Sequence, residues 1–163
     1  MTGVSATITD ELLTALRRAY ALNWHGIHGF DHWHRVWENG RRLAEATGAN
    51  LVVVELFAFL HDIKRENEGR DPGHGQRAAD FAWGLRDSLI ELEDVDFENL
   101  IYACAHHTDG LIEGSMTVRT CWDADRLDLG RVGIKPDPNR LCTAAARRPD
   151  VLTWAIRRSQ NGR

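Results

Sequence analysis

Apolar residues recur at intervals of three and four along most of the chain, the spacing that places them on one face of an α-helix. The first such series contains Leu12, Leu13 and Leu16 and predicts a helix over about residues 10–22. Thr9 is its predicted N-cap, because a threonine hydroxyl can accept a hydrogen bond from a free amide of the first turn. The two glycines within residues 23–30 predict a loop after this helix.

A second and a third helix are predicted on either side of Gly48, a residue type that commonly ends helices. Asp31 is the predicted N-cap of the second helix, and Asn50 that of the third. The third covers LVVVELFAFL at residues 51–60, the most apolar stretch of the chain. Its β-branched valines weakly favour a strand. The sequence offers no second strand to pair with it, so a buried helix is predicted.

Further helical segments are predicted through the rest of the chain. His74 opens one of them, and Asp96 caps another, which ends in histidines. Their approximate ranges are residues 74–87, 96–107 and 117–133, with two short segments at residues 141–146 and 151–158. Because no repeat, linker or pair of strands interrupts this pattern, an all-α fold is predicted, with a single-domain helical bundle over residues 1–163.

The composition adds limits on partners and location. The chain carries 20 lysine and arginine residues against 24 aspartate and glutamate residues, a formal net charge of −4. Nucleic-acid-binding domains usually present a basic face, so no nucleic-acid polymer is expected as a partner. The apolar runs are shorter than the roughly twenty residues of a membrane-spanning helix, and the N-terminus lacks a secretory pattern. No membrane partner is expected, a cytoplasmic location is predicted, and a homodimer is compatible with the sequence.

Cysteine and histidine usage points away from a thiol-based metal site. The three cysteines, Cys104, Cys121 and Cys142, form no CxxC pair and are predicted to pack as reduced, apolar groups. The chain also contains eight histidines. Several of these stand at the ends of predicted helices, where their side chains can meet.

Histidine and aspartate side chains gather where the predicted helices begin and end. His32 starts the second helix, His61 and Asp62 finish the third, and Asp125 lies in a later one. In an antiparallel bundle the start of one helix lies beside the finish of its neighbour, so His32 and His61 are expected to converge. A buried His-Asp pair needs partners to offset its desolvation, and one or two metal ions would supply them. Nitrogen and carboxylate ligands together suit Mn²⁺, Fe²⁺, Co²⁺, Ni²⁺ or Zn²⁺.

At these residues the chain resembles the HD-domain superfamily of metal-dependent phosphohydrolases. HWHRV at residues 32–36 matches the family pattern HxxRV, His61-Asp62 matches the HD pair, and ADRL at residues 124–127 matches the later aspartate motif. The resemblance covers about residues 25–135, and the joint order of three motifs is a specific signal.

The resemblance implies a metal site, with one divalent transition-metal ion expected. Its ligands would be His32, His61, Asp62 and Asp125. Some members of the family hold a second ion through histidines that lie between the HD pair and the last aspartate. His74 and His106 occupy that part of the order, with His107 as the alternative to His106. Asp62 would then bridge the two ions.

The resemblance also implies hydrolysis of a small phosphorylated substrate, such as a nucleotide. A bound metal ion acidifies water and polarises a phosphoryl oxygen, with Asp62 at the reaction centre. Lys64, Arg65 and Arg77 are predicted to neutralise phosphate charge, Lys64 also as a catalytic group. Asp109 is predicted to accept a proton or to orient a neighbouring group.

Two other functions fit the same motifs. One is a mixed-valent di-iron oxygenase of the same fold, which needs all six ligands. The other is a non-enzymatic module that binds a nucleotide without converting it. The sequence lacks the GYP signature of cyclic-dinucleotide phosphodiesterases, so that substrate is not supported.

Overall fold

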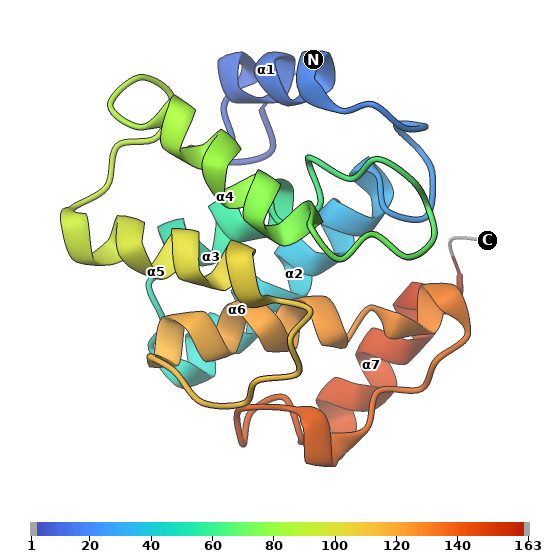
Figure 1. The fold of residues 1–163 in the computed structure, drawn as a ribbon. Coiled ribbons are helices and arrows are strands. Elements are labelled where there is room, and N and C mark those ends of the chain that lie inside the picture. Colours follow the sequence, from blue (N-terminus) through green and yellow to red (C-terminus); the bar gives the residue numbers. More distant parts are fainter. Residues whose placement is uncertain (1–2, 162–163) are drawn as a thin grey trace.

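The periodic apolar pattern forms helices throughout residues 3–161, the part of the chain that this computed structural model describes. Within these residues the only β-interaction is an isolated parallel bridge between Arg86 and Ile90. The elements are α1 (Asp10–Ala19), α2 (Phe30–Thr47), α3 (Leu51–Leu60), α4 (His74–Leu85), α5 (Asp94–His106), α6 (Met116–Arg126), the 3₁₀ helices η1 (Leu129–Val132) and η2 (Pro138–Arg140), and α7 (Pro149–Gln160) (Figure 1). The prediction of an all-α, single-domain fold is confirmed.

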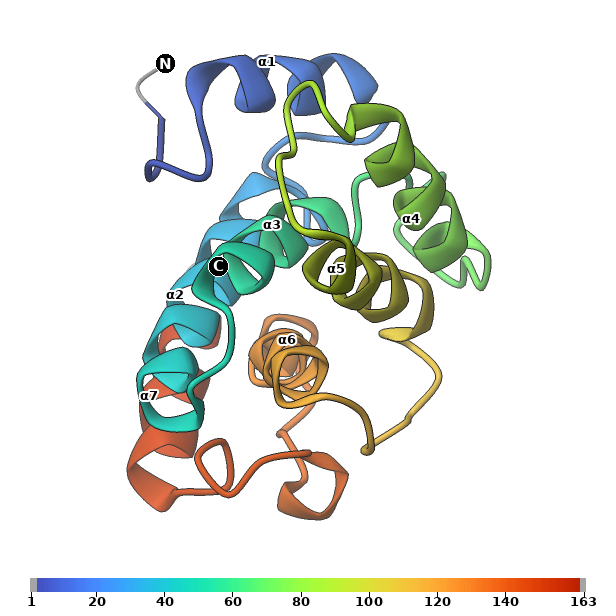
Figure 2. The same ribbon diagram turned by 90° about the vertical axis from the view of Figure 1, so that its left-hand side faces the viewer.

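Helix α3 lies at the centre of the arrangement and contacts α2, α4, α5 and α6. Figure 2 shows α2 running beside it on one side and α5 on the other. Every residue from Val53 to Leu60 is buried, so α3 has no solvent-exposed face over that length. Burial of one large apolar side chain stabilises a fold by about 1.5–3 kcal/mol, which outweighs the weak preference of valine for strands. Asn50 caps the helix as predicted, its side chain accepting from Val52 N at 3.0 Å.

A glycine lets α2 approach α3 closely. A Cβ atom on Gly40 would lie 2.4 Å from Val54 Cγ1 and 3.5 Å from the side chain of Ala124 in α6. No side chain larger than hydrogen fits there without a shift. Gly40 therefore brings together the three helices that carry His32, His61 and Asp125.

Several helix ends differ from the sequence predictions. The helix predicted over residues 117–133 ends at Arg126 and is followed by the separate 3₁₀ helix η1, and the one predicted over residues 74–87 ends at Leu85. Helix α1 stops at Ala19, three residues before the predicted end. Helix α2 begins after Gly29 and not after Asp31, whose carboxylate instead lies 3.1 Å from His25 Nδ1. Helix α5 begins after Glu93, ahead of the predicted cap Asp96. Thr9 caps the start of α1 and Gly48 the end of α2, as predicted.

The predicted helix over residues 141–146 is wrong. This segment forms turns, because the buried carboxylate of Asp123 gathers its amides. Asp123 accepts from Cys142 N at 2.7 Å and from Thr143 N at 2.8 Å, and also from the Thr143 hydroxyl. Residues 151–158 are helical as predicted, within α7.

The three cysteines are free and buried, and burial raises the pKa of the Cys142 thiol to about 12.

Among the described helices, none combines the length and the apolar content that crossing a bilayer would require.

Candidate metal centre

His32 is held by a carboxylate on its far side. Its ring is fully buried in the first turn of α2, and its Nδ1–H donates to Asp128 Oδ2 at 2.6 Å. Arg35 in turn donates to both Asp128 oxygens, at 2.8 and 3.1 Å. A histidine that donates from Nδ1 to a carboxylate presents the lone pair of Nε2, the form in which imidazole binds metal.

Three more buried histidines are oriented in the same way by backbone carbonyls. His61 Nδ1 lies 3.1 Å from the carbonyl oxygens of both Phe57 and Ala58, one turn earlier in α3. The other two donors are His107 Nδ1, which is 2.7 Å from the Cys104 oxygen, and His74 Nδ1, which contacts the Asp71 oxygen. All four rings therefore turn Nε2 away from the hydrogen-bonded side.

The four Nε2 atoms meet in two pairs. The distance from His32 Nε2 to His61 Nε2 is 3.1 Å, and that from His74 Nε2 to His107 Nε2 is 2.9 Å. Since each Nδ1 is already a donor, each pair directs two lone pairs at one another in a buried space. Two nitrogens at about 2.0–2.1 Å from one ion, with angles between roughly 90° and 110°, lie about 2.8–3.4 Å apart. Both pairs therefore fit a shared cation.

Asp62 connects the two pairs. Its Oδ2 atom lies 3.6 Å from Nε2 of His32 and of His61. Its Oδ1 atom lies 3.0 Å from His74 Nε2 and 3.5 Å from His107 Nε2. One carboxylate thus offers one oxygen to each pair.

Asp125 completes the first of these groups. It lies near the C-terminal end of α6, and its Oδ1 is 3.4 Å from His32 Nε2 and 3.5 Å from His61 Nε2. We call His32, His61 and Asp125 the first lobe, and His74 and His107 the second lobe; Asp62 belongs to both. Potential ligand atoms lie within 4.8 Å of one another in three overlapping triads drawn from these six residues.

The electrostatics of the first lobe follow from burial and mutual contact. Burial lowers the pKa of His32, and Arg131 lowers it further. Burial opposes ionisation of Asp62 and Asp125, but His61 and the other neighbouring imidazoles hold both pKa values well below the ordinary range. Burial likewise opposes the charged form of His61, yet Asp62 and Asp125 raise its pKa. Both carboxylates, Asp62 buried and Asp125 partly buried, are therefore ionised, and a bound cation would offset their charge.

Close packing of α4 against α5 forms the second lobe. A Cβ atom on Gly75 would lie 2.7 Å from the Cys104 carbonyl oxygen and 2.9 Å from that of Ala105. Because these are backbone atoms, a larger residue would push the helices apart. Gly75 thus allows His74 to lie next to His107.

The prediction of His106 is corrected in favour of His107. The His107 side chain is buried within the second lobe, whereas that of His106 is 40% exposed, with its Nδ1 2.6 Å from Asp109 Oδ2. The sequence held a signal for this choice, since His107 shares a helical face with the buried Leu100 and Cys104. Asp109 is itself exposed, so the structure pairs it with His106 and does not bring it to the lobes.

Of the three predicted phosphate-binding cations, Lys64 and Arg77 contact other parts of the protein. Lys64 Nζ lies over the ring of Phe81, 5.8 Å from its centroid. Arg77 is bound to the carboxylate of Asp71 and donates to the Lys64 carbonyl at 3.1 Å. The structure thus brings neither Lys64 Nζ nor Arg77 to the lobes.

Arg65 does reach the site. It is buried, and its Nε lies 3.9 Å from Asp62 Oδ1. Its Nη2 donates to the Gly69 carbonyl, while Nε and Nη1 have no hydrogen-bond partner among residues 3–161. His28 also lies here, with Nδ1 3.0 Å from Asp62 Oδ2, so it steadies that carboxylate.

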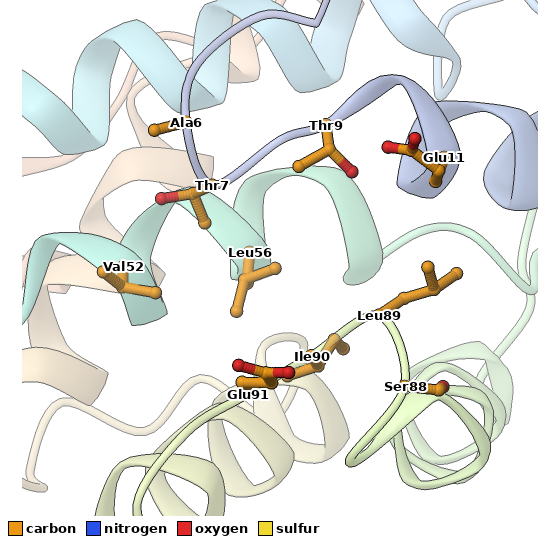
Figure 3. A pocket seen from close by; sticks show the side chains of 10 residues that line it. All are labelled: Ala6, Thr7, Thr9, Glu11, Val52, Leu56, Ser88, Leu89, Ile90 and Glu91. Carbon is orange, nitrogen blue, oxygen red and sulfur yellow. The ribbon is translucent and has the colours of Figure 1, made fainter.

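A cavity of about 680 Å³ opens beside the second lobe. His107 forms part of its wall, together with residues of the segment that follows α6, among them Lys135 and Arg140. Sequence analysis missed these residues, because only the fold brings that segment next to His107. A second cavity, of about 510 Å³, lies between the start of α1, α3 and the connection from α4 to α5 (Figure 3). No residue of either lobe lines it.

Comparisons with known proteins agree with this geometry. The model of the HD-domain family matches residues 29–144. The crystal structure of a predicted HD superfamily hydrolase from an uncultured Thermotogales bacterium superposes with a TM-score of 0.70 at 26% sequence identity. The similarity covers 90% of this chain and 84% of that one. The comparison with curated proteins gives no match.

Proposed function

The chain belongs to the HD-domain family, and from this premise we propose that it is a metal-dependent phosphohydrolase acting on a nucleotide or another small phosphorylated metabolite. The observation that carries the proposal is the convergence of four Nε2 atoms around the two oxygens of Asp62. The neighbouring cavity provides room for a small substrate next to these ligands.

The six side chains of the two lobes would hold the metal. Imidazole nitrogen with carboxylate oxygen suits a divalent ion from the set Mn, Fe, Co, Ni and Zn. Bound there, such an ion supplies Lewis acidity, which lowers the pKa of water and polarises a phosphoryl oxygen. Two lobes that share Asp62 can accommodate two ions, one more than the single ion expected from the sequence.

The protein side chains supply orientation and charge. Asp128 and the backbone carbonyls fix the four imidazoles, so that their lone pairs point inward before substrate arrives. Arg65 adds positive charge beside Asp62, with its Nε 3.9 Å from Asp62 Oδ1. Its Nε and Nη1 atoms are enclosed by protein, so donation from them to a phosphate would require the side chain to move.

The test uses protein stripped of metal and reloaded with each of the five ions. Wild-type protein is expected to release inorganic phosphate from at least one member of a panel of nucleotides and phosphomonoesters, and His61→Ala is expected to release none. His106→Ala serves as the matched control and should keep its activity. Absence of turnover with every ion and every substrate would refute the proposal. Recovery of an intact bound nucleotide would then favour a sensing module.

A di-iron oxygenase is the second candidate, and the presence of all six ligand positions favours it. It requires about two irons per chain and consumption of oxygen during turnover. Anaerobic preparation with iron, followed by an oxygen-electrode measurement, separates the two functions. Phosphate release under strictly anaerobic conditions would exclude the oxygenase as the explanation of that activity.

A further inference from the structure

Most of the wall of the cavity beside His107 consists of residues that are not proposed metal ligands. Apolar side chains from Leu129, Ile134, Pro136 and Leu141 form part of it. Its volume of about 680 Å³ lies in the range typical of small-molecule pockets, roughly 300–1,000 Å³. A ligand lying here would touch both the second lobe and the segment between α6 and α7.

The charged groups on this wall are mostly cationic. Arg126, Lys135 and Arg140 line the cavity, and Asp137 is the one carboxylate among its lining residues. Asp137 is already engaged, since its Oδ1 accepts from Asn139 N at 2.9 Å and caps η2. The charge of this wall therefore favours binding of an anionic group at a position separate from the metal ligands.

Arg126 contributes charge, and both of its terminal nitrogens already donate within the protein, Nη1 also to Cys142 Sγ at 3.2 Å. Its Nη1 donates to the Arg140 carbonyl at 2.8 Å, and its Nη2 donates to the Leu111 carbonyl at 2.6 Å. It thereby ties the loop after α5 to the segment after α6, and these are two walls of the cavity.

Lys135 and Arg140 differ from Arg126 in this respect. Both are exposed, and within residues 3–161 neither side chain forms an ion pair or a hydrogen bond. Their N–H groups are therefore available to a ligand. Because a charge-assisted hydrogen bond is stronger than a neutral one, two such groups can select an anionic ligand.

We propose that Lys135 and Arg140 bind a second anionic group of the substrate, while the lobes receive the phosphoryl group that is cleaved. The inference rests on the proposed hydrolysis and narrows its substrate class. The substrate would be a small phosphoester with a second phosphate or a carboxylate at some distance from the first, joined by a largely apolar or aromatic body. A nucleoside that carries phosphate on two separate positions meets this description.

The test compares a nucleoside 3′,5′-bisphosphate, a 5′-monophosphate of the same nucleoside and a phosphomonoester that bears a carboxylate. Lys135→Gln combined with Arg140→Gln should raise KM for the bisphosphate by about 10-fold or more and leave kcat within about twofold. KM for the monophosphate should stay within about twofold. If KM for the carboxylate substrate rises as much as KM for the bisphosphate, the site accepts either anion; if only KM for the bisphosphate rises, the site prefers phosphate.

Arg157→Gln provides the control. Arg157 lines a neighbouring cavity that Lys135 also borders, but it does not line the one beside His107. Its loss should change none of the three KM values. An equal loss for mono- and bisphosphate in the double variant, or an equal effect of Arg157→Gln, would overturn the inference.

Binding separates this inference from the proposed function. Calorimetry with metal-loaded protein measures the dissociation constants of the bisphosphate and the monophosphate without turnover as the readout. If the bisphosphate binds more tightly and loses that advantage in the double variant although no substrate is hydrolysed, the anion site stands and the hydrolase proposal falls. If hydrolysis occurs but the double variant binds both ligands like wild type, the anion site alone falls.

Discussion

The two lobes differ in what orients their histidines, because the first lobe uses a carboxylate for one of them. In the first lobe, a carboxylate positions His32: Asp128 accepts from it and is held by Arg35. In the second lobe, backbone carbonyls of Asp71 and Cys104 position His74 and His107. His61, the other histidine of the first lobe, is oriented by the backbone carbonyls of Phe57 and Ala58. The first lobe therefore depends in part on side chains that a substitution can remove. The second depends on how closely α4 and α5 pack.

The surroundings of the two lobes differ as well. The first lobe draws on α2, α3 and α6, which pack around the centre of the fold. The second draws on α4 and α5, and α4 packs mainly against α5, beside which it lies in Figure 2. A change in α4 should thus disturb the second lobe and leave the first largely intact, whereas loss of Asp62 should disable both.

Asp62→Asn should have the largest effect, because it removes the one carboxylate that faces both lobes. We expect kcat to fall by at least about 10³-fold and metal content to fall in the same sample. Elemental analysis and steady-state kinetics measure both. Asp109→Asn is the matched control on an exposed carboxylate, and it should change neither quantity; a large loss in that variant would restore Asp109 as a catalytic group.

His107→Ala should have the second-largest effect. It removes a nitrogen ligand of the second lobe, so activity is expected to fall by about 10²-fold or more and one ion should be lost from a two-ion site. His106→Ala, one residue away, should behave like wild type, since that ring faces Asp109 at the surface. The reverse order of the two variants would show that the wrong histidine has been assigned.

Asp128→Asn should weaken the first lobe selectively. Loss of a carboxylate behind a metal-binding histidine typically lowers metal affinity by about 10–100-fold. Competition with a chromophoric chelator measures this affinity for each ion. A loss confined to the ion of the second lobe, or no loss at all, would contradict the difference drawn between the lobes.

Gly75→Ala should act on the second lobe through packing. Its methyl group would meet backbone oxygens of α5 at 2.7 and 2.9 Å, so we expect the free energy of unfolding to fall by about 1–3 kcal/mol. Gly84→Ala in the same helix is the control, because a Cβ there meets nothing within 4 Å. Gly84→Ala should raise stability by about 0.5–1 kcal/mol. Denaturant unfolding distinguishes them, and equal effects would argue against the close approach.

Asp71→Asn should have the smallest and most pH-dependent effect. Burial opposes ionisation of Asp71, but hydrogen bonds from Arg77 and from the Glu66 amide lower its pKa below the ordinary 3.8. A carboxyl with a lower pKa in the folded state contributes stability above about pH 3.8 and loses it as the pH falls through the folded pKa. The stability difference between wild type and variant should therefore be full at pH 6 and shrink below pH 3.8, which thermal unfolding at both pH values can check.

The sequence predicted the parts of this structure that depend on local pattern. Thr9 and Asn50 cap the starts of their helices and Gly48 the end of α2, as expected, because each supplies its own capping geometry. The first lobe was also predictable, because three ordered motifs of a known family identified its residues. The family and the fold are confirmed by the match over residues 29–144.

The features that could not be predicted from the sequence depend on contacts between distant segments. Residues 141–146 form turns because Asp123, in another element, gathers their amides. Lys64 and Arg77 look available in the sequence, but Phe81 and Asp71 engage them in the fold. The cations Lys135 and Arg140 become relevant only when the segment after α6 is seen to lie beside His107.

The most direct test of the two-lobed centre is a crystal structure of metal-loaded protein, with anomalous scattering recorded on both sides of the absorption edge of the metal. We predict one ion between His32, His61 and Asp125, a second between His74 and His107, and Asp62 in contact with both. Anomalous density elsewhere, with no ion at Asp62, would contradict the account.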